Sequence, residues 1–185
     1  MNKYHLNDYL KCSLLSHAST FKATSYDEDN KEHLCQDEST HNVYDFDAYV
    51  AATHPKSELP ASPDAVYIGD KNLYFVEFKN QPARNINKDQ IRRKFCSGTK
   101  ILQSMLQGFT PRDCTYIFCV AFKSTSQPKY FDSRHFQQTS SRFELDVLNE
   151  EHGRFYDQII TEDIDFFRNK FGSSPNRVGD LSLIS

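Results

Sequence analysis

The chain has 185 residues, of which 38% are hydrophobic, and a formal net charge of -3 at pH 7. This length and apolar content suit one domain with a substantial core, and the weakly acidic balance is not typical of a protein that binds nucleic acid over its whole surface. No apolar run has the length of a membrane span and the N-terminus has no signal-peptide pattern, so we expect no membrane contact. Five cysteines without a regular framework favour a reducing cytoplasm. The missing signal-peptide pattern does not exclude export by a specialised secretion system.

The first third of the chain predicts a helix followed by less regular segments. Leucine and tyrosine residues at helical spacing predict a helix over residues 5–17. Residues 25–41 are acidic and polar, which predicts a loop or a short helix, and residues 43–52 fit either a strand or a helix. Prolines over residues 55–63 then predict a loop.

Two apolar runs at residues 65–68 and 73–79 flank a Gly-Asp-Lys-Asn cluster, which predicts a β-hairpin. A turn centred on this cluster places Asp64 directly opposite Glu77. Opposed carboxylates repel each other, so this arrangement needs a shared proton or a bound cation. Strand alternation places Lys79 on the same face as Glu77, so two carboxylates and an ammonium converge at one end of the hairpin. Such a group suits a divalent metal and an attacking water.

A Glu-x-Lys pair on a strand often marks only a face in contact with water. The run at residues 73–79 is apolar on both faces, however, and such a strand is normally buried on both sides. A charged pair on a buried strand is expected at the end of a sheet and not on an open surface. The sequence therefore favours a functional site over a solvated strand.

The residues of this hairpin resemble the PD-(D/E)XK nuclease superfamily, which has the restriction-endonuclease-like fold. Pro63-Asp64 matches the PD element, and Glu77-Phe78-Lys79 matches the (D/E)XK element. The resemblance extends over roughly residues 63–123. It implies an α/β fold with a mixed central β-sheet flanked by helices and an αβββαβ core, in a single nuclease domain over residues 1–171. Residues 172–185 are expected to form a flexible C-terminal tail.

The same resemblance implies the chemistry of the site. Asp64 and Glu77 would bind Mg²⁺, with Mn²⁺ as a substitute, and the backbone carbonyl of Phe78 would be a third ligand. Lys79 would orient or deprotonate the attacking water and stabilise the developing charge on phosphorus. Gln81, two residues beyond the lysine, would be a further catalytic residue.

A basic segment over residues 79–100 begins at the end of the hairpin and continues into a helix predicted over residues 88–107, which ends near Gly108. Five of its basic residues are candidates for holding a nucleic-acid backbone. They are Arg84, Lys88, Arg92, Arg93 and Lys94. The alternative is a helix whose basic face only contacts solvent.

The remaining segments complete the predicted sheet and its cover. A continuous apolar run predicts a buried strand at residues 115–122, and polar composition predicts a loop at 124–141. Alternation through residues 143–147 predicts an edge strand. Aromatic and aliphatic residues at helical spacing predict a final helix within residues 155–171, packed on the core.

These observations predict a metal-dependent nuclease that hydrolyses phosphodiester bonds, in DNA more than in RNA, with a homodimer or a protein partner also expected. The alternative is a catalytically silent nuclease fold that binds protein, as an immunity protein, inhibitor or assembly subunit. The acidic stretch before the hairpin motivates this alternative. Many members of the superfamily carry a further acidic ligand, and four candidates for it stay open, which leaves the number of metals open. They are Glu32, Glu38, Asp45 and Asp47.

Overall fold

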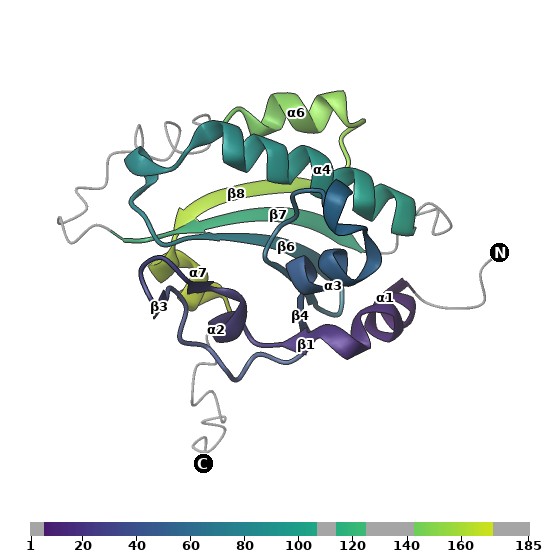
Figure 1. The fold of residues 1–185 in the computed structure, drawn as a ribbon, viewed down its shortest axis with the longest axis horizontal. Coiled ribbons are helices and arrows are strands. Elements are labelled where there is room, and N and C mark those ends of the chain that lie inside the picture. Colours follow the sequence, from purple (N-terminus) through teal and green to yellow (C-terminus); the bar gives the residue numbers. More distant parts are fainter. Residues whose placement is uncertain (1–5, 107–113, 125–142, 172–185) are drawn as a thin grey trace, which may run out of the picture.

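The computed structural model describes residues 6–106, 114–124 and 143–171. Its centre is a mixed six-stranded sheet flanked by helices (Figure 1), which confirms the predicted α/β class. The strand order is β1-β4-β5-β6-β7-β8, antiparallel from β1 to β6 and parallel from β6 to β8. The strands are β1 (Ala18–Ser19), β4 (Val43–Asp45), β5 (Ala65–Ile68), β6 (Asn72–Lys79), β7 (Thr115–Phe122) and β8 (Gln158–Asp163).

The helices form two layers around this sheet. They are α1 (Leu6–Leu14), α2 (Phe21–Thr24), α3 (Phe46–Thr53), α4 (Lys88–Leu106), α6 (Leu145–Glu151) and α7 (Ile164–Phe171), with short 3-10 turns at Leu15–His17, Lys56–Glu58 and Ala83–Asn85. Helices α4 and α6 cover one face of the sheet, and α2 and α7 lie on the other (Figure 1). The parallel connections β6–α4–β7 and β7–α6–β8 therefore place both of their helices in one layer.

Side-chain alternation along β6 divides the core between the two layers. Phe75 packs in the same cluster as Phe95 of α4 and Phe118 of β7, and the rings of Phe95 and Phe118 lie 4.8 Å apart. Phe78 faces the other way and meets Phe167 of α7 with ring centroids 5.3 Å apart. The residues on either side of Phe78 in the strand consequently face the α4 layer.

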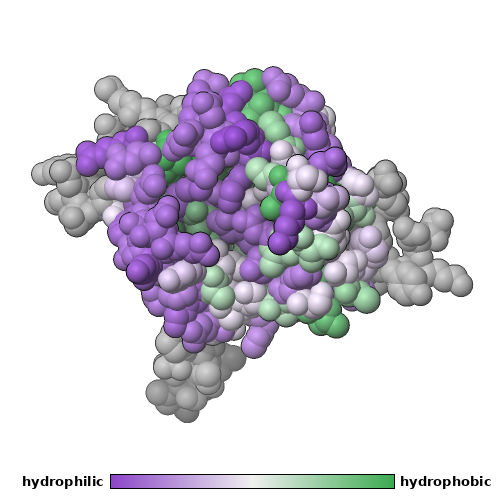
Figure 2. Space-filling model, viewed as in Figure 1, coloured by the Kyte–Doolittle hydropathy of each residue, from purple (hydrophilic) through white to green (hydrophobic). Residues whose placement is uncertain are grey.

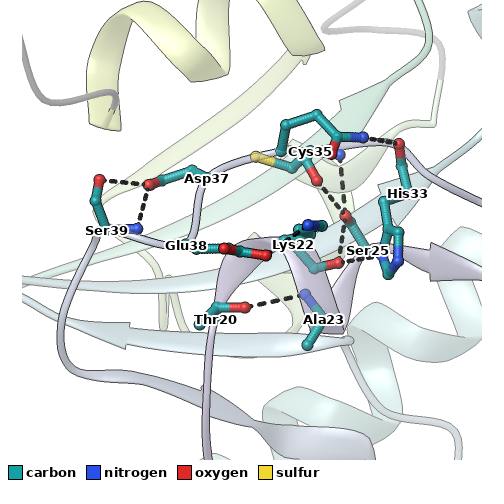
Figure 3. A network of polar contacts seen from close by, with 10 residues as sticks. Thr20, Lys22, Ala23, Ser25, His33, Cys35, Asp37, Glu38 and Ser39 are labelled. Carbon is teal, nitrogen blue, oxygen red and sulfur yellow. Dashed lines mark hydrogen bonds and ion pairs between the residues drawn. The ribbon is translucent and has the colours of Figure 1, made fainter.

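The acidic segment at residues 25–41 forms a small antiparallel hairpin of β2 (Tyr26–Asp27) and β3 (Glu32–His33). The prediction of a loop or short helix is correct as a loop for residues 35–41 and misses this hairpin, whose ends are fixed by side chains. The hydroxyl of Ser25 accepts a hydrogen bond from the backbone N–H of Cys35 at 2.9 Å, within the polar network of Figure 3. This hydrogen bond joins the residue before the hairpin to the chain that leaves it.

Most of the predicted elements in the first two thirds of the chain are present. The β5–β6 hairpin has the predicted register, with Ile68 opposite Leu73. The segment at 43–52, predicted as either a strand or a helix, contains both, because β4 leads directly into α3. Asp45 ends the strand and caps the helix, because its carboxylate accepts the N–H of Ala48 at 2.8 Å. The helix predicted at 88–107 and the strand predicted at 115–122 correspond to α4 and β7.

The edge strand predicted at residues 143–147 is wrong, because this part of the chain begins α6. Leu145 and Leu148 are buried three residues apart, which is a helical spacing. Val147 is 57% exposed. The sequence places Val147 two residues after Leu145, which suggested the two-residue period of a strand. The buried residues instead follow the period of about 3.6 residues of a helix.

The final helix predicted within residues 155–171 is only partly correct, because β8 precedes α7. The Ile-Ile-Thr run at 159–161 is β-branched and suits a strand, and it pairs in parallel with β7. Phe167 is buried, whereas Phe166 is 39% exposed and does not belong to the core stripe.

Three predictions fall outside the described residues: the helix stop at Gly108, the loop beyond Ser124 and the tail at 172–185. Among the described residues, no helix combines the length and the apolar character needed to cross a membrane. The face drawn in Figure 2 is mainly hydrophilic. Large hydrophobic side chains that are exposed include Leu15 at 67% and Leu59 at 51%.

Candidate active site

Two carboxylates meet at the end of β6 where its antiparallel pairing with β5 stops. The ladder ends with Ala65 opposite Val76, so the next residues along it are Asp64 and Glu77. The structure thus brings together the two carboxylates that the predicted register opposed. Glu77 is completely buried, and the side chain of Asp64 is 17% exposed. The Oδ2 atom of Asp64 accepts the backbone N–H of Phe78 at 2.6 Å.

Two lysines contact these carboxylates. Lys79 shares the face of Glu77, and its Nζ lies 2.9 Å from Glu77 Oε1. Lys94 comes from α4, and its Nζ lies 2.7 Å from Asp64 Oδ1 and 2.9 Å from Glu77 Oε2. The lysine side chains are 14% and 15% exposed, so the cluster is largely shielded from solvent. Lys94 was predicted to hold a nucleic-acid backbone, and the structure places it between the carboxylates instead.

Glu77 is the least well solvated member of the cluster. Both of its oxygens are buried, and despite the 2.9 Å contacts neither has a hydrogen bond of good geometry to a described residue. Burial and the charge of Asp64 raise the pKa of Glu77 to about 7, and the two lysines only partly oppose them. Burial lowers the pKa of Lys94. The carboxylates of Asp64 and Glu77 raise it by more than burial lowers it, so the net shift of this pKa is upward. Lys94 therefore stays charged, and Glu77 is the group poised to exchange a proton near neutral pH.

Of the four further acidic candidates, Asp47 contacts this cluster, through Lys94. It lies in the first turn of α3, and its Oδ2 is 3.7 Å from Lys94 Nζ. The hydroxyl of Ser62, two residues before Asp64, donates a hydrogen bond to its Oδ1. The other three candidates have different roles. Glu32 pairs with Lys123, Glu38 pairs with Lys22, and Asp45 caps α3.

The backbone of β6 also favours the predicted third ligand. The carbonyl of Lys79 accepts the N–H of Lys123 on the β7 side. Since successive carbonyls along a strand face opposite neighbours, the carbonyl of Phe78 faces the side on which Asp64 lies. Gln81 follows the strand as an exposed residue, and its own carbonyl also accepts the N–H of Lys123, at 3.2 Å.

Two of the remaining basic residues predicted to bind nucleic acid contact an acidic side chain, and the other two are exposed. Lys88 and Arg92 contact the same carboxylate, that of Glu144, at 2.6 Å and 2.9 Å. Arg84 and Arg93 are exposed. The sequence carried no signal for the Glu144 contacts, because this residue lies about fifty positions away on the segment that leads into α6.

Gly98 allows α4 to pack closely against Pro63, the residue before Asp64. A Cβ atom at Gly98 would lie 2.5 Å from Cδ of Pro63, so only glycine allows this approach. Lys94 lies four residues earlier on the same face of the helix. The close contact of Gly98 with Pro63 therefore positions Lys94 over the neighbouring Asp64.

Replacing Gly98 by alanine is expected to lower the free energy of unfolding by about 1–2 kcal/mol. The overpacking against a rigid proline ring outweighs the roughly 1 kcal/mol that alanine gains in helix propensity. Urea denaturation measures this change, with the exposed Lys100→Ala on the same helix as the control of unchanged stability. A G98A protein as stable as the wild type would show that the helix does not depend on this contact.

The donor types at this site fit a hard divalent cation, because Mg²⁺ prefers carboxylate and carbonyl oxygens. In the part of the chain that the structure describes, no three His, Cys, Asp or Glu side chains converge in a way that would hold a metal ion. At this position two carboxylates converge, and the ammonium of Lys94 lies between them. The site thus has oxygen ligands of the right kind around a position that already carries positive charge.

Two surface hollows, of about 380 Å³ and 420 Å³, are lined by other residues. The first lies beside α6 and includes Asp146 and Tyr156, and the second lies at the β5–β6 turn and includes Tyr67. Buried charged groups in mutual contact gather instead at Asp64 and Glu77. We therefore take this pair, and neither hollow, as the candidate active site.

The chain matches none of the protein-family models, curated proteins or solved structures with which it was compared. A function for this site must therefore be inferred from its own residues and their geometry.

Proposed function

We propose that the protein is a Mg²⁺-dependent nuclease, with Mn²⁺ as a substitute, that hydrolyses phosphodiester bonds in nucleic acid. The observation that carries the proposal is the convergence of Asp64, Glu77 and Lys79 at the carboxyl end of β6. Elements α1, β4, β5, β6, α4 and β7 follow one another in the order of a restriction-endonuclease-like αβββαβ core, which supports this fold. Elements β1, α2, β2 and β3 lie between α1 and β4, and α3 lies between β4 and β5. DNA is favoured over RNA by the resemblance of the motif to the PD-(D/E)XK superfamily.

The residues of the site would divide the chemistry between them. Asp64, Glu77 and the carbonyl of Phe78 would hold the metal, which when bound activates a water and neutralises charge on the phosphate. Lys79 extends from the same strand face, where its ammonium would orient the attacking water and stabilise the charge that develops on phosphorus. The low solvent exposure of this cluster strengthens each of these electrostatic interactions.

Contacts to the nucleic-acid backbone would come from exposed residues that follow β6 in the chain. Arg84 and Arg93 are exposed on the chain that follows β6, and Gln81 lies directly after the strand. Lys88 and Arg92 would contribute only after exchanging Glu144 for phosphate. Cleavage of both strands would need two such sites, which a homodimer supplies. All five cysteines are free, which supports a reducing cytoplasm as the place of action.

Incubation of the purified chain with supercoiled plasmid tests this proposal. We expect nicking or linearisation with Mg²⁺ or Mn²⁺ and none with a chelator. The Asp64→Asn variant, purified in the same way, is expected to lose cleavage by about 10²-fold or more, because it removes one ligand charge while keeping the side-chain shape. Intact plasmid, single-stranded DNA and RNA under all metal conditions would reject the nuclease.

A protein-binding module is the second candidate, and one observation favours it. Lys94 already contacts both Asp64 and Glu77, so each carboxylate has a positively charged partner without a metal. Such a module would bind its partner equally well in Mg²⁺ and in chelator. Metal-dependent cleavage that Asp64→Asn abolishes would exclude it as the sole function.

A further inference from the structure

Each carboxylate of the site turns one oxygen to a donor on β6 and the other to Lys94. Asp64 Oδ2 accepts the N–H of Phe78, and Glu77 Oε1 faces Lys79. The two oxygens that remain, Asp64 Oδ1 and Glu77 Oε2, both face Lys94 Nζ at 2.7 Å and 2.9 Å. These are the oxygens that a cation shared by the two carboxylates would contact.

The charge of Lys94 excludes a second cation from this position. Asp64 and Glu77 face the two ammonium groups of Lys79 and Lys94, so each carboxylate already has a positively charged neighbour. A divalent cation touching the same two oxygens would lie within a few ångströms of the Lys94 ammonium, in a place with little water to screen the repulsion. Lys94 and a metal therefore compete for one place.

Asp47 offers Lys94 a second partner on the outer side of the cluster. Its Oδ2 lies 3.7 Å from Lys94 Nζ, and its side chain is 51% exposed. Its other oxygen is held by the hydroxyl of Ser62, so the carboxylate has a fixed orientation. The four-carbon stem of lysine is flexible enough to move the ammonium this short way while α4 stays in place.

We propose that Lys94 is a displaceable internal cation of the metal site. It holds Asp64 and Glu77 together when no metal is bound, and it moves onto Asp47 when a divalent cation takes its place. The free protein consequently binds divalent cations weakly, and Asp47 acts by receiving Lys94 and not as a metal ligand. This inference rests on the proposed function, because it assumes that Asp64 and Glu77 are the metal ligands.

Binding of Mn²⁺ alone to the full chain tests the competition, measured by electron paramagnetic resonance of free Mn²⁺ without nucleic acid. Lys94→Met keeps the apolar stem and removes the ammonium. We expect it to bind Mn²⁺ at least about tenfold more tightly than the wild type. Lys94→Gln serves the same purpose should the methionine variant fail to fold. Circular dichroism establishes that each variant is folded, and adding Asp64→Asn to Lys94→Met should abolish the gain.

The results separate this inference from the proposed function. Equal, Asp64-dependent affinity in wild type and Lys94→Met would overturn the competition and leave the metal site standing. Absence of Asp64-dependent binding in every folded variant would overturn both.

The role of Asp47 has its own test in the same measurement. Asp47→Asn is expected to weaken Mn²⁺ binding when Lys94 is present and to have no effect in the Lys94→Met background. Equal weakening in both backgrounds would make Asp47 a direct ligand and would overturn its role as the acceptor of Lys94. No weakening in either background would also overturn it.

Discussion

Replacing Lys79 by alanine is expected to lower the rate of metal-dependent DNA cleavage by about 10²–10⁴-fold while the fold stays intact. Its ammonium lies 2.9 Å from Glu77 Oε1, on the strand face that carries the proposed ligands. The Lys79→Ala variant lacks this ammonium, which is the one group proposed both to orient the water and to stabilise the charge on the phosphate. Single-turnover cleavage of supercoiled plasmid at saturating Mg²⁺ measures this change, because it isolates the chemical step from metal and substrate binding.

Two further variants make this experiment specific. Lys79→Met keeps the apolar stem of the side chain and should be as inactive as Lys79→Ala, which separates lost charge from lost packing. Lys71→Ala removes an exposed lysine next to the opposite end of β6 and should cleave at the wild-type rate. Wild-type activity in a folded Lys79→Ala protein would reject the proposed role of Lys79. Equal losses of activity in Lys79→Ala, Lys79→Met and Lys71→Ala would indicate a general effect of positive charge.

The parts of the site that the sequence predicted are those set by local rules. The turn between β5 and β6 fixes a register, and a register fixes which side chains oppose each other. Asp64, Glu77 and Lys79 could therefore be placed together from about fifteen residues of sequence. The prediction held because β6 is buried on both faces, so its alternation could not slip without exposing apolar side chains.

The parts that the sequence could not predict depend on packing between distant segments. A helical pattern placed Lys94 among basic residues, but its side chain turns toward the carboxylates because Gly98 lets α4 pack closely against Pro63. Asp47 could not be selected from four acidic candidates, because α3 approaches the site through the sheet order and not through sequence proximity. The pairing of Glu144 with the basic helix is of the same kind.

The misassigned elements show a related limit. Around α6, a run of three apolar residues with a spacing of two fits a strand, although burial of Leu145 and Leu148 follows the helix. Short apolar patterns do not distinguish the two periods, and the neighbouring layer decides. At β8 the deciding interaction is the open edge of β7, which accepts the Ile-Ile-Thr run as a parallel partner.

Replacing Glu77 by glutamine is expected to stabilise the metal-free protein at pH 8 by up to about 3 kcal/mol and to change its stability little at pH 5. The folded protein raises the pKa of Glu77 from its ordinary value of 4.5 to about 7, mainly through burial and the charge of Asp64. A raised carboxyl pKa means that the folded state prefers the neutral form. Its contribution to stability is therefore complete below about 4.5 and is lost as the pH rises through about 7. Glutamine keeps the neutral form at every pH.

Urea denaturation in chelator at pH 5 and pH 8 measures the difference between wild type and Glu77→Gln at each pH. Other titrating groups are common to both proteins, so their effects on stability cancel in this difference. They include Asp27 and Asp37, whose lowered pKa values affect stability at more acidic pH. Glu150→Gln, which alters an exposed ion pair with Arg154, should leave both differences near zero. The same Glu77→Gln variant should lose Mn²⁺ binding, since the charge that destabilises the empty site is the one proposed to hold the metal. A difference that does not grow between pH 5 and pH 8 would mean that Lys79 and Lys94 already stabilise Glu77 as a carboxylate, and the expected pH dependence would be wrong.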